Sequence, residues 1–200
     1  CNFIHAYASY IYILMKRLFD IALGLLLLPI SLGLMIIIAG LVRLSSKGPI
    51  IHWSDRVGKR NIIFKMPKFR TMHSESPNIA SNLLKNPEDY VTSIGSFLRK
   101  SSLDEIPQII SVITGDMSIV GPRPALFNQY DLIKLRTENG IDQLAPGVTG
   151  WAQVNGRDEL TTVEKVAFDI EYLNRMSFFF DLMVLWKSLS VLITRKNISH

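Results

Sequence analysis

The feature that most constrains this chain is an apolar run of 22 residues, Ile21 to Val42, which contains no charged side chain. A continuous helix of that length measures roughly 33 Å, which is enough to cross a hydrocarbon core of about 30 Å. Pro29 lies inside the run, where it removes a backbone hydrogen bond and favours a kink. Residues 15–45 are therefore predicted to enter a membrane, either as a spanning helix or as a re-entrant, Pro-broken helix-break-helix.

Basic residues flank this run on both sides: Lys16 and Arg17 precede it, and Arg43 and Lys47 follow it. Cytoplasmic loops carry an excess of Lys and Arg, so a symmetric distribution does not orient a single span and suits a helix that returns to the side it entered from. The residues alone leave both alternatives open. A cleaved signal peptide fits poorly, because the run is longer than a signal core and no small-residue cleavage site follows it.

The apolar and aromatic residues 1–14 are interpreted as an N-terminal extension, and residues 46–200 as one domain of a size that can bury a core. Two β-favouring runs around a Gly-containing turn predict a hairpin, and four segments have helical spacing. The predicted fold class is therefore α-rich α+β, a compact domain with a small β-hairpin or sheet. The expected strands are 50–53 and 62–66, the expected helices are 94–100, 106–113, 127–139 and 162–174, and the polar segment 74–89 is expected to be a loop.

The segment from Phe178 to Ile193 is largely apolar but contains Asp181 and Lys187. A core helix and an interfacial membrane helix explain it equally well, because aromatic and basic residues also suit the headgroup boundary. Both interpretations stay open at this point.

Lysine and arginine outnumber the acids 22 to 17, for a formal net charge of +5, which favours phosphorylated substrates, anionic lipid or nucleic acid as partners. The basic residues are scattered and form no nucleic-acid recognition module, so no nucleic-acid partner is predicted. The single cysteine, Cys1, excludes an internal disulfide and a cysteine-built zinc site. Cytoplasmic exposure is therefore the default expectation.

The polar residues that suggest chemistry fall into four clusters, 68–72, 103–108, 115–124 and 146–157. The second contains the adjacent acids Asp104 and Glu105, preceded by Arg99. A carboxylate can attack phosphorus or bind Mg²⁺, and arginine presents a planar fork that matches phosphate. Two acids before a helix also give favourable N-terminal electrostatics, so this pair alone is a weak signal.

The third and fourth clusters are rich in glycine and proline, and each places an arginine, Arg123 or Arg157, at a rigid turn. Tight connections alone would explain the glycines and prolines but not the repeated arginines. Phosphate-binding loops explain both.

Five segments together resemble the bacterial monotopic phosphoglycosyl transferases, also called the bacterial sugar transferase family. They occur in the family's order and span about residues 15–195. The segments are Lys16 to Asp20, Lys68 to Met72, Leu103 to Gln108, Gly115 to Pro124 and Pro146 to Arg157.

This resemblance implies a catalytic domain on the cytoplasmic face of the bacterial inner membrane, held there by a re-entrant helix and by amphipathic interfacial helices, the C-terminal one included. The family's helix break usually involves a serine before the proline. Here Leu28 precedes Pro29, so the details of the break are expected to differ.

The reaction implied by the resemblance takes a UDP-sugar and undecaprenyl phosphate and gives undecaprenyl-diphosphate-sugar and UMP. Asp104 would be the nucleophile that forms an aspartyl phosphosugar, and Glu105 would position Mg²⁺ or the lipid phosphate, or act as a base. Both acids would bind Mg²⁺. The residues expected to bind substrate are Lys68, Arg70, Arg99, Pro122, Arg123, Pro124, Gln153, Asn155 and Arg157.

Other functions account for less of the sequence. A metal-dependent glycosyltransferase would often carry an Asp-x-Asp triplet, which this chain lacks. A non-enzymatic membrane-surface protein leaves the four clusters unexplained, and a sugar-nucleotide hydrolase differs only in using water as the acceptor. The sugar and the pathway are left open, as is a homodimer, and the polar segment from Ser74 to Tyr90 is hypothesised to choose the sugar.

Overall fold

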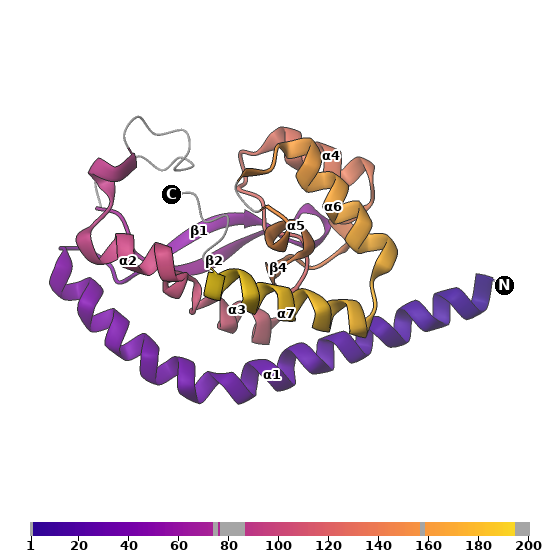
Figure 1. The fold of residues 1–200 in the computed structure, drawn as a ribbon, viewed down its shortest axis with the longest axis horizontal. Helices are drawn as coiled ribbons and strands as arrows, with labels where there is room; N and C mark the ends of the chain where they lie inside the picture. Colours follow the sequence, from indigo (N-terminus) through magenta and orange to yellow (C-terminus); the bar gives the residue numbers. More distant parts are fainter. Residues whose placement is uncertain (1, 74–75, 77–86, 157–158, 195–200) are drawn as a thin grey trace.

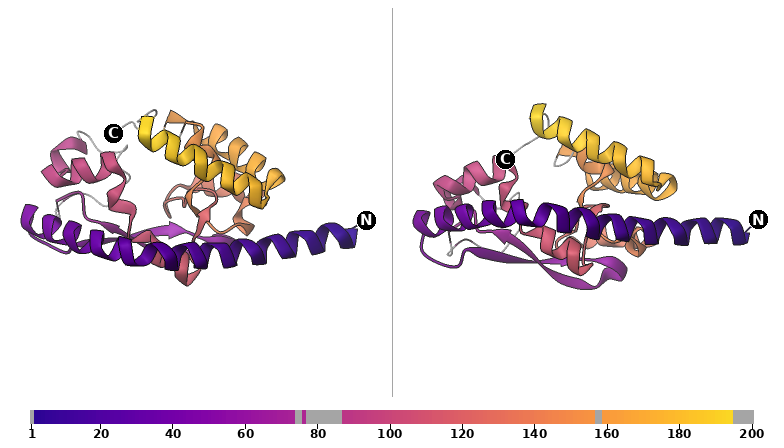
Figure 2. Two further views of the ribbon diagram at one scale, coloured as in Figure 1. Left: turned by 60° about the horizontal axis from the view of Figure 1, so that its bottom comes forward. Right: turned by 90° about the horizontal axis from the view of Figure 1, so that it is seen from below.

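The computed structural model describes residues 2–73, 76, 87–156 and 159–194 (Figure 1). A long helix, α1 (Asn2–Ser45), runs along one side of a domain built from the remaining elements. Seen from below in Figure 2, helix α7 and the β-hairpin lie on either side of α1. The predicted α-rich α+β class is confirmed.

Helix α1 is continuous through Pro29 and bends near its middle instead of breaking (Figure 1). The structure thus shows Pro29 within a continuous helix, and a break at this residue in the membrane stays a prediction. One proline removes a single backbone hydrogen bond and leaves the rest of a long helix intact. The Ser31 hydroxyl donates back to the carbonyl of Leu27, a bond that also favours bending. The re-entrant path itself stays a prediction.

The contacts of α1 with the domain lie towards its two ends. Asp20 and Gly24 are buried on one arm and Ile38 and Val42 on the other, whereas no residue between 25 and 37 is buried. Of the described residues, only those of α1 form a helix long and apolar enough to cross a membrane. The bend therefore exposes apolar surface that water would not favour.

A buried carboxylate joins the first arm of α1 to α7 (Phe178–Thr194). Asp181 is 4% exposed, and its Oδ2 accepts hydrogen bonds from Lys16 Nζ at 2.6 Å and the Tyr12 hydroxyl at 2.9 Å. Its Oδ1 accepts one from the Tyr172 hydroxyl at 2.7 Å. Lys16 therefore forms an ion pair with a buried residue of the domain and is not simply a solvent-exposed charge beside the apolar run.

Two further polar residues of α1 bind the domain's backbone. Arg17 donates to the carbonyls of Val112, at 2.6 Å, and Ile113, at 2.8 Å, where α3 (Gln108–Thr114) ends. Asp20 Oδ1 accepts a hydrogen bond from the backbone N–H of Ile119 at 3.1 Å. These contacts satisfy groups that a helix end and a short strand would otherwise leave unpaired.

The predicted hairpin is confirmed, with longer strands than expected. Strand β1 (Ile51–Val57) pairs with β2 (Ile63–Phe69) in antiparallel register, Ile51 opposite Phe69. A second, parallel pair, β3 (Ser118–Val120) with β4 (Gly147–Thr149), was not predicted. Strands of three residues inside glycine-rich turns carry too little periodicity to be recognised in sequence.

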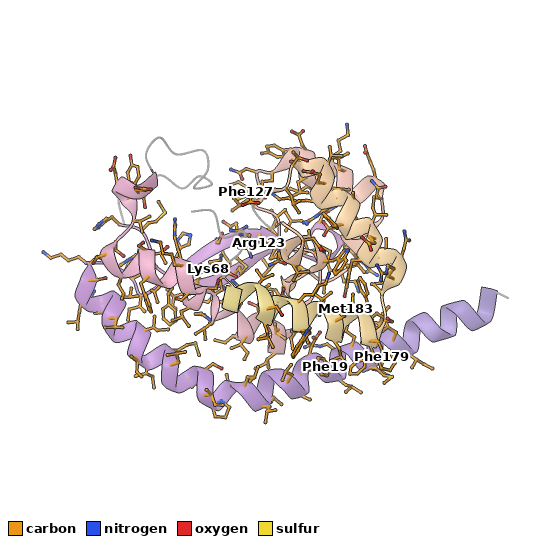
Figure 3. The ribbon with its side chains drawn as sticks, in the orientation of Figure 1. Phe19, Lys68, Arg123, Phe127, Phe179 and Met183 are labelled. Atoms are coloured by element: carbon orange, nitrogen blue, oxygen red, sulfur yellow. The ribbon has the colours of Figure 1, made fainter. Side chains whose placement is uncertain are left out.

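The four predicted helices are confirmed within a few residues, and the C-terminal helix packs partly into the core, while its interfacial role stays a prediction. One face of α7 is buried through Phe180 and Val184, while Phe179 and Trp186 are exposed on another face. Where α7 meets α1, the ring of Phe19 packs edge-to-face on that of Phe178, with centroids 5.3 Å apart; Figure 3 labels Phe19 in this region. Most of the predicted loop 74–89 lies outside the described residues.

The other helices are α2 (Ser93–Ser101), α4 (Tyr130–Glu138), α5 (Trp151–Val154) and α6 (Thr162–Arg175). Short 3-10 turns lie at Lys59–Asn61, Pro87–Tyr90, Leu103–Glu105 and Ile141–Gln143.

Asp181→Ala is expected to lower the free energy of unfolding by about 3–5 kcal/mol, because it leaves the Lys16 ammonium buried without its partner. Denaturant unfolding in detergent measures the change. The control is Asp55→Ala, which removes an exposed ion pair with Lys65 and should change stability by less than about 1 kcal/mol. Equal effects of the two substitutions would contradict the structural role of Asp181.

Candidate active site

The two adjacent acids lie on a short 3-10 turn, η4 (Leu103–Glu105), between α2 and α3. Helix α2 ends at Ser102, which adopts a left-handed conformation with φ +57°. Pro107 directly precedes the next helix, and its fixed φ of −60° already matches a helical backbone. This abrupt change of direction holds Asp104, which is 8% exposed, at the junction.

Glu105 lies between two cations that come from distant parts of the chain. Its Oε1 is 2.6 Å from Lys68 Nζ on β2 and 2.9 Å from Arg123 Nη2 on the loop after β3. Figure 3 shows Lys68 and Arg123 near each other on the side of the domain away from α1. Three of the four predicted clusters therefore meet at one carboxylate.

The environment acts on the two carboxylates in opposite directions. Burial raises the pKa of Asp104, and the charges of Lys68, Arg123 and Arg99 only partly oppose that effect. Burial alone would also raise the pKa of Glu105, but the charges and hydrogen bonds of Arg123 and Lys68 hold it well below its usual value. Neighbouring acids with divergent pKa values suit separate chemical roles.

Asp104 accepts no hydrogen bond from any described residue, although three cations lie around it. Its oxygens keep their lone pairs for another ligand or for an electrophile. Glu105 is instead fixed by two charge-assisted hydrogen bonds, which are stronger and more directional than neutral ones. The geometry thus separates a free carboxylate from one that holds its cationic neighbours in place.

The loop that carries Arg123 is fixed through its backbone carbonyls. Pro122 accepts a hydrogen bond from the N–H of Gly147 at 2.8 Å, and Pro124 accepts one from Arg56 Nη1 at 3.0 Å. Pro122 and Pro124 therefore limit the backbone on both sides of the arginine, as expected for rigid supports. Their direct contact with substrate stays a prediction.

Arg56 is a site residue that the sequence did not reveal. It lies on β1, and burial followed by the charge of Arg123 lowers its pKa to about 10. The charge of Glu105 acts in the opposite direction. In the sequence Arg56 belongs to a hairpin turn, and nothing in that pattern indicates that it faces the acids.

Arg99 and Arg70, both expected to bind substrate, have different surroundings. Arg99 donates to Thr71 Oγ1 at 2.9 Å, and its charge acts on Asp104, so it belongs to the site. Arg70 is 5% exposed and donates instead to the carbonyl and hydroxyl of Ser46, at 2.7 and 2.8 Å. It supports the connection after α1, and the structure does not bring it to the acid pair.

The fourth predicted cluster is only partly described. Gln153 donates to the carbonyl of Val148 at 3.0 Å and Asn155 to that of Trp151 at 2.8 Å, so both side chains hold their own turn. Arg157 lies outside the described residues. Binding of substrate by these residues stays a prediction.

Mg²⁺ was expected at Asp104 and Glu105. The described residues contain no group of three or more His, Cys, Asp or Glu side chains that would hold a metal by themselves. Mg²⁺, however, commonly uses one or two carboxylates together with substrate phosphates and water. Asp104 and Oε2 of Glu105 fit that mode, because both ion pairs of Glu105 use Oε1.

Comparison with known proteins decides the family. Residues 11–195 match the bacterial sugar transferase family, and this range contains all five segments that carry the resemblance. The chain belongs to this family. The resemblance inferred from the sequence is thus confirmed.

Members of the bacterial sugar transferase family with curated names are 33–40% identical to this chain. The UDP-glucose:undecaprenyl-phosphate glucose-1-phosphate transferase of Escherichia coli is 40% identical over 86% of this chain, which spans only 39% of that relative. The uncharacterized sugar transferase EpsL of Bacillus subtilis is 36% identical, covering 94% of this chain and 91% of the relative. The undecaprenyl-phosphate galactose phosphotransferase of Salmonella typhimurium is 34% identical over 90% of this chain and 41% of its own length.

Glu105→Gln is expected to lower the melting temperature at pH 7, because it removes the negative charge between Lys68 and Arg123. A carboxylate with a depressed pKa stabilises the fold above its unfolded pKa, near 4.5, and loses this effect as the pH falls towards its folded pKa. The difference in melting temperature between wild type and variant should therefore be constant near neutral pH and become smaller only below about pH 4.5. Thermal unfolding across a pH series measures it, and a difference that narrows already near pH 7 would refute the assignment.

Proposed function

We propose that this chain transfers a sugar 1-phosphate from a UDP-sugar to undecaprenyl phosphate, giving undecaprenyl-diphosphate-sugar and UMP. The observation that carries the proposal is the environment of Asp104. This buried carboxylate accepts no hydrogen bond from the residues that the structure describes, and three cations surround it. The names of the E. coli and Salmonella relatives supply the class of acceptor, and the first also names a UDP-sugar. In polysaccharide synthesis such a transfer is the first membrane step.

The proposed chemistry has two displacements at the same phosphorus. An Asp104 oxygen attacks the phosphorus attached to the sugar, forming an aspartyl phosphosugar and breaking the bond to UMP. A phosphate oxygen of the lipid then attacks that phosphorus, and the bond to Asp104 breaks. The carboxylate is regenerated, and because both phosphates react as anions no net proton transfer is required. Covalent catalysis of this kind predicts ping-pong kinetics.

Glu105 acts in this mechanism by holding its cationic neighbours, Lys68 and Arg123. A carboxylate whose pKa is held well below its usual value is a poor general base near neutral pH. Its ion pairs instead keep both cations beside Asp104, where their charges reduce the repulsion between the nucleophile and the donor's diphosphate. Of the roles expected for Glu105, the geometry therefore favours positioning.

Mg²⁺ is proposed as the cofactor, held by Asp104 and Glu105 together with phosphate oxygens of the donor. When bound, it supplies positive charge that neutralises the diphosphate and the leaving UMP. Arg99 and Arg123 would bind the remaining phosphate charge with their planar forks.

The two arms of α1 support a re-entrant path on the cytoplasmic face of the inner membrane. Asp20 and Gly24 on the first arm and Ile38 and Val42 on the second are buried in the same domain. A spanning helix would place its two ends on opposite sides of the bilayer. The unburied apolar segment between these arms is therefore proposed to dip into the bilayer and return, keeping the site beside a lipid-bound acceptor. A homodimer and the lack of a nucleic-acid partner stay predictions.

Asp104→Asn is expected to abolish lipid-dependent release of UMP, because an amide cannot form the acyl phosphate. The assay supplies Mg²⁺ and a panel of UDP-sugars to the protein in detergent, with and without undecaprenyl phosphate. The matched control is Asp131→Asn, an exposed aspartate on α4, which should retain wild-type activity. Full activity of Asp104→Asn would exclude Asp104 as the nucleophile, and UMP release without lipid at the same rate would indicate a hydrolase.

The rate of donor cleavage is expected to fall at acidic pH, with a midpoint above the usual aspartate pKa, because burial raises the pKa of Asp104. Lys68 opposes this effect, so Lys68→Met should move the acid limb of kcat/KM to still higher pH. Lys65→Met, an exposed lysine on the same strand, should leave the limb in place. A limb that stays fixed in Lys68→Met would contradict the proposed electrostatic coupling.

A further inference from the structure

Three consecutive carbonyls in the loop after β3 are bound by three different elements. Those of Pro122 and Pro124 accept hydrogen bonds from β4 and β1, as described above. Between them, the carbonyl of Arg123 accepts a hydrogen bond from Arg136 Nη1 on α4, at 2.8 Å. Pro122 and Pro124 have no N–H, so at these two residues the backbone can be held only through its carbonyls.

A buried aspartate on α6 orients Arg136. Asp169 is 1% exposed, and its Oδ2 lies 2.9 Å from Arg136 Nε and 2.7 Å from Nη2. The Arg136 side chain is itself 11% exposed. Two nitrogens of one planar guanidinium therefore bind the aspartate while the third binds the carbonyl of Arg123.

Stability alone does not explain this ion pair. Apolar contacts among Ala125, Leu132, Ile141 and Val166 already pack α4 against α6 and the loop. Buried ion pairs often stabilise a fold no better than apolar residues of similar volume. The ion pair of Arg136 with Asp169 instead fixes the orientation of the guanidinium, and this orientation sets where the remaining N–H of Arg136 points.

We infer that Arg136, oriented by Asp169, is a positioning residue that fixes the backbone of Arg123 and so directs its guanidinium at Glu105 and at the phosphate of a bound donor. The donor rests on the proposed function, whereas the constraint on the loop does not. Because the guanidinium lies several bonds beyond the carbonyl, a small rotation of the peptide displaces it. A displacement of about 1 Å can slow a reaction by about 100-fold.

The decisive variant is Arg136→Lys, which keeps a positive charge beside Asp169 but has no planar fork to bind the aspartate and the carbonyl together. We expect kcat/KM for the UDP-sugar to fall by about 10- to 100-fold. Asp169→Asn, which is isosteric, should change it in the same direction. The control Lys134→Met alters an exposed charge on the same helix and should change the rate by less than about twofold.

A double-mutant cycle separates positioning from a general structural role. If Arg136 acts through Arg123, then Arg136→Lys should lower the rate by less than about twofold in an Arg123→Ala background. Effects of the two substitutions that multiply would overturn the inference.

Amide hydrogen exchange in the substrate-free protein tests the constraint independently of activity. Exchange in peptides covering residues 121–126 should accelerate in Arg136→Lys, while peptides from α7 keep their wild-type rates. Faster exchange in the loop would support the inference even if the wild-type protein released no UMP, an outcome that would count only against the proposed function. Unchanged exchange in the loop would overturn the inference whatever the activity.

Discussion

The site depends on one buried interaction, the carboxylate of Glu105 between Lys68 and Arg123. Each of these charges is costly to bury alone, and together they form a compensated group at the meeting point of a strand, a turn and a loop. The interaction brings cations close to Asp104 without binding that residue. Glu105, itself an acid, thus gives Asp104 a positive environment, because it keeps two positive charges beside the carboxylate that is proposed to react.

A second constraint acts at the membrane side of the domain. The same stretch of α1 that begins the apolar run contributes Lys16, Arg17 and Asp20, each bonded to a different element of the domain. The second arm is held by apolar packing through Ile38 and Val42. Polar bonds hold one arm and apolar packing holds the other, so both arms of the helix are fixed to the domain that carries the candidate site.

Periodic elements of this fold were predictable, and features that depend on distant contacts were not. Helices such as Thr162–Arg175 have enough turns for an apolar pattern to emerge, whereas β3 and β4 pair only because glycines allow close backbone approach. In the site, Asp104, Glu105 and Arg123 were found from motifs. Arg56 was missed, and Arg70, expected to bind substrate, lies against Ser46, because the direction of a side chain is set by packing and not by its neighbours in sequence.

The prolines beside Arg123 also limit how this loop could bind the phosphates of the proposed reaction. Many phosphate-binding loops present a row of backbone amides, which fix the geometry of one bound group. Here Pro122 and Pro124 carry no amide hydrogen, so a phosphate would be bound by the flexible side chain of Arg123, which extends from a rigid backbone. A guanidinium of this kind can follow a phosphorus atom as its substituents change. In the proposed reaction, this one arginine would therefore serve successive anions of different shape, whereas a rigid ring of amides would fit only one of them.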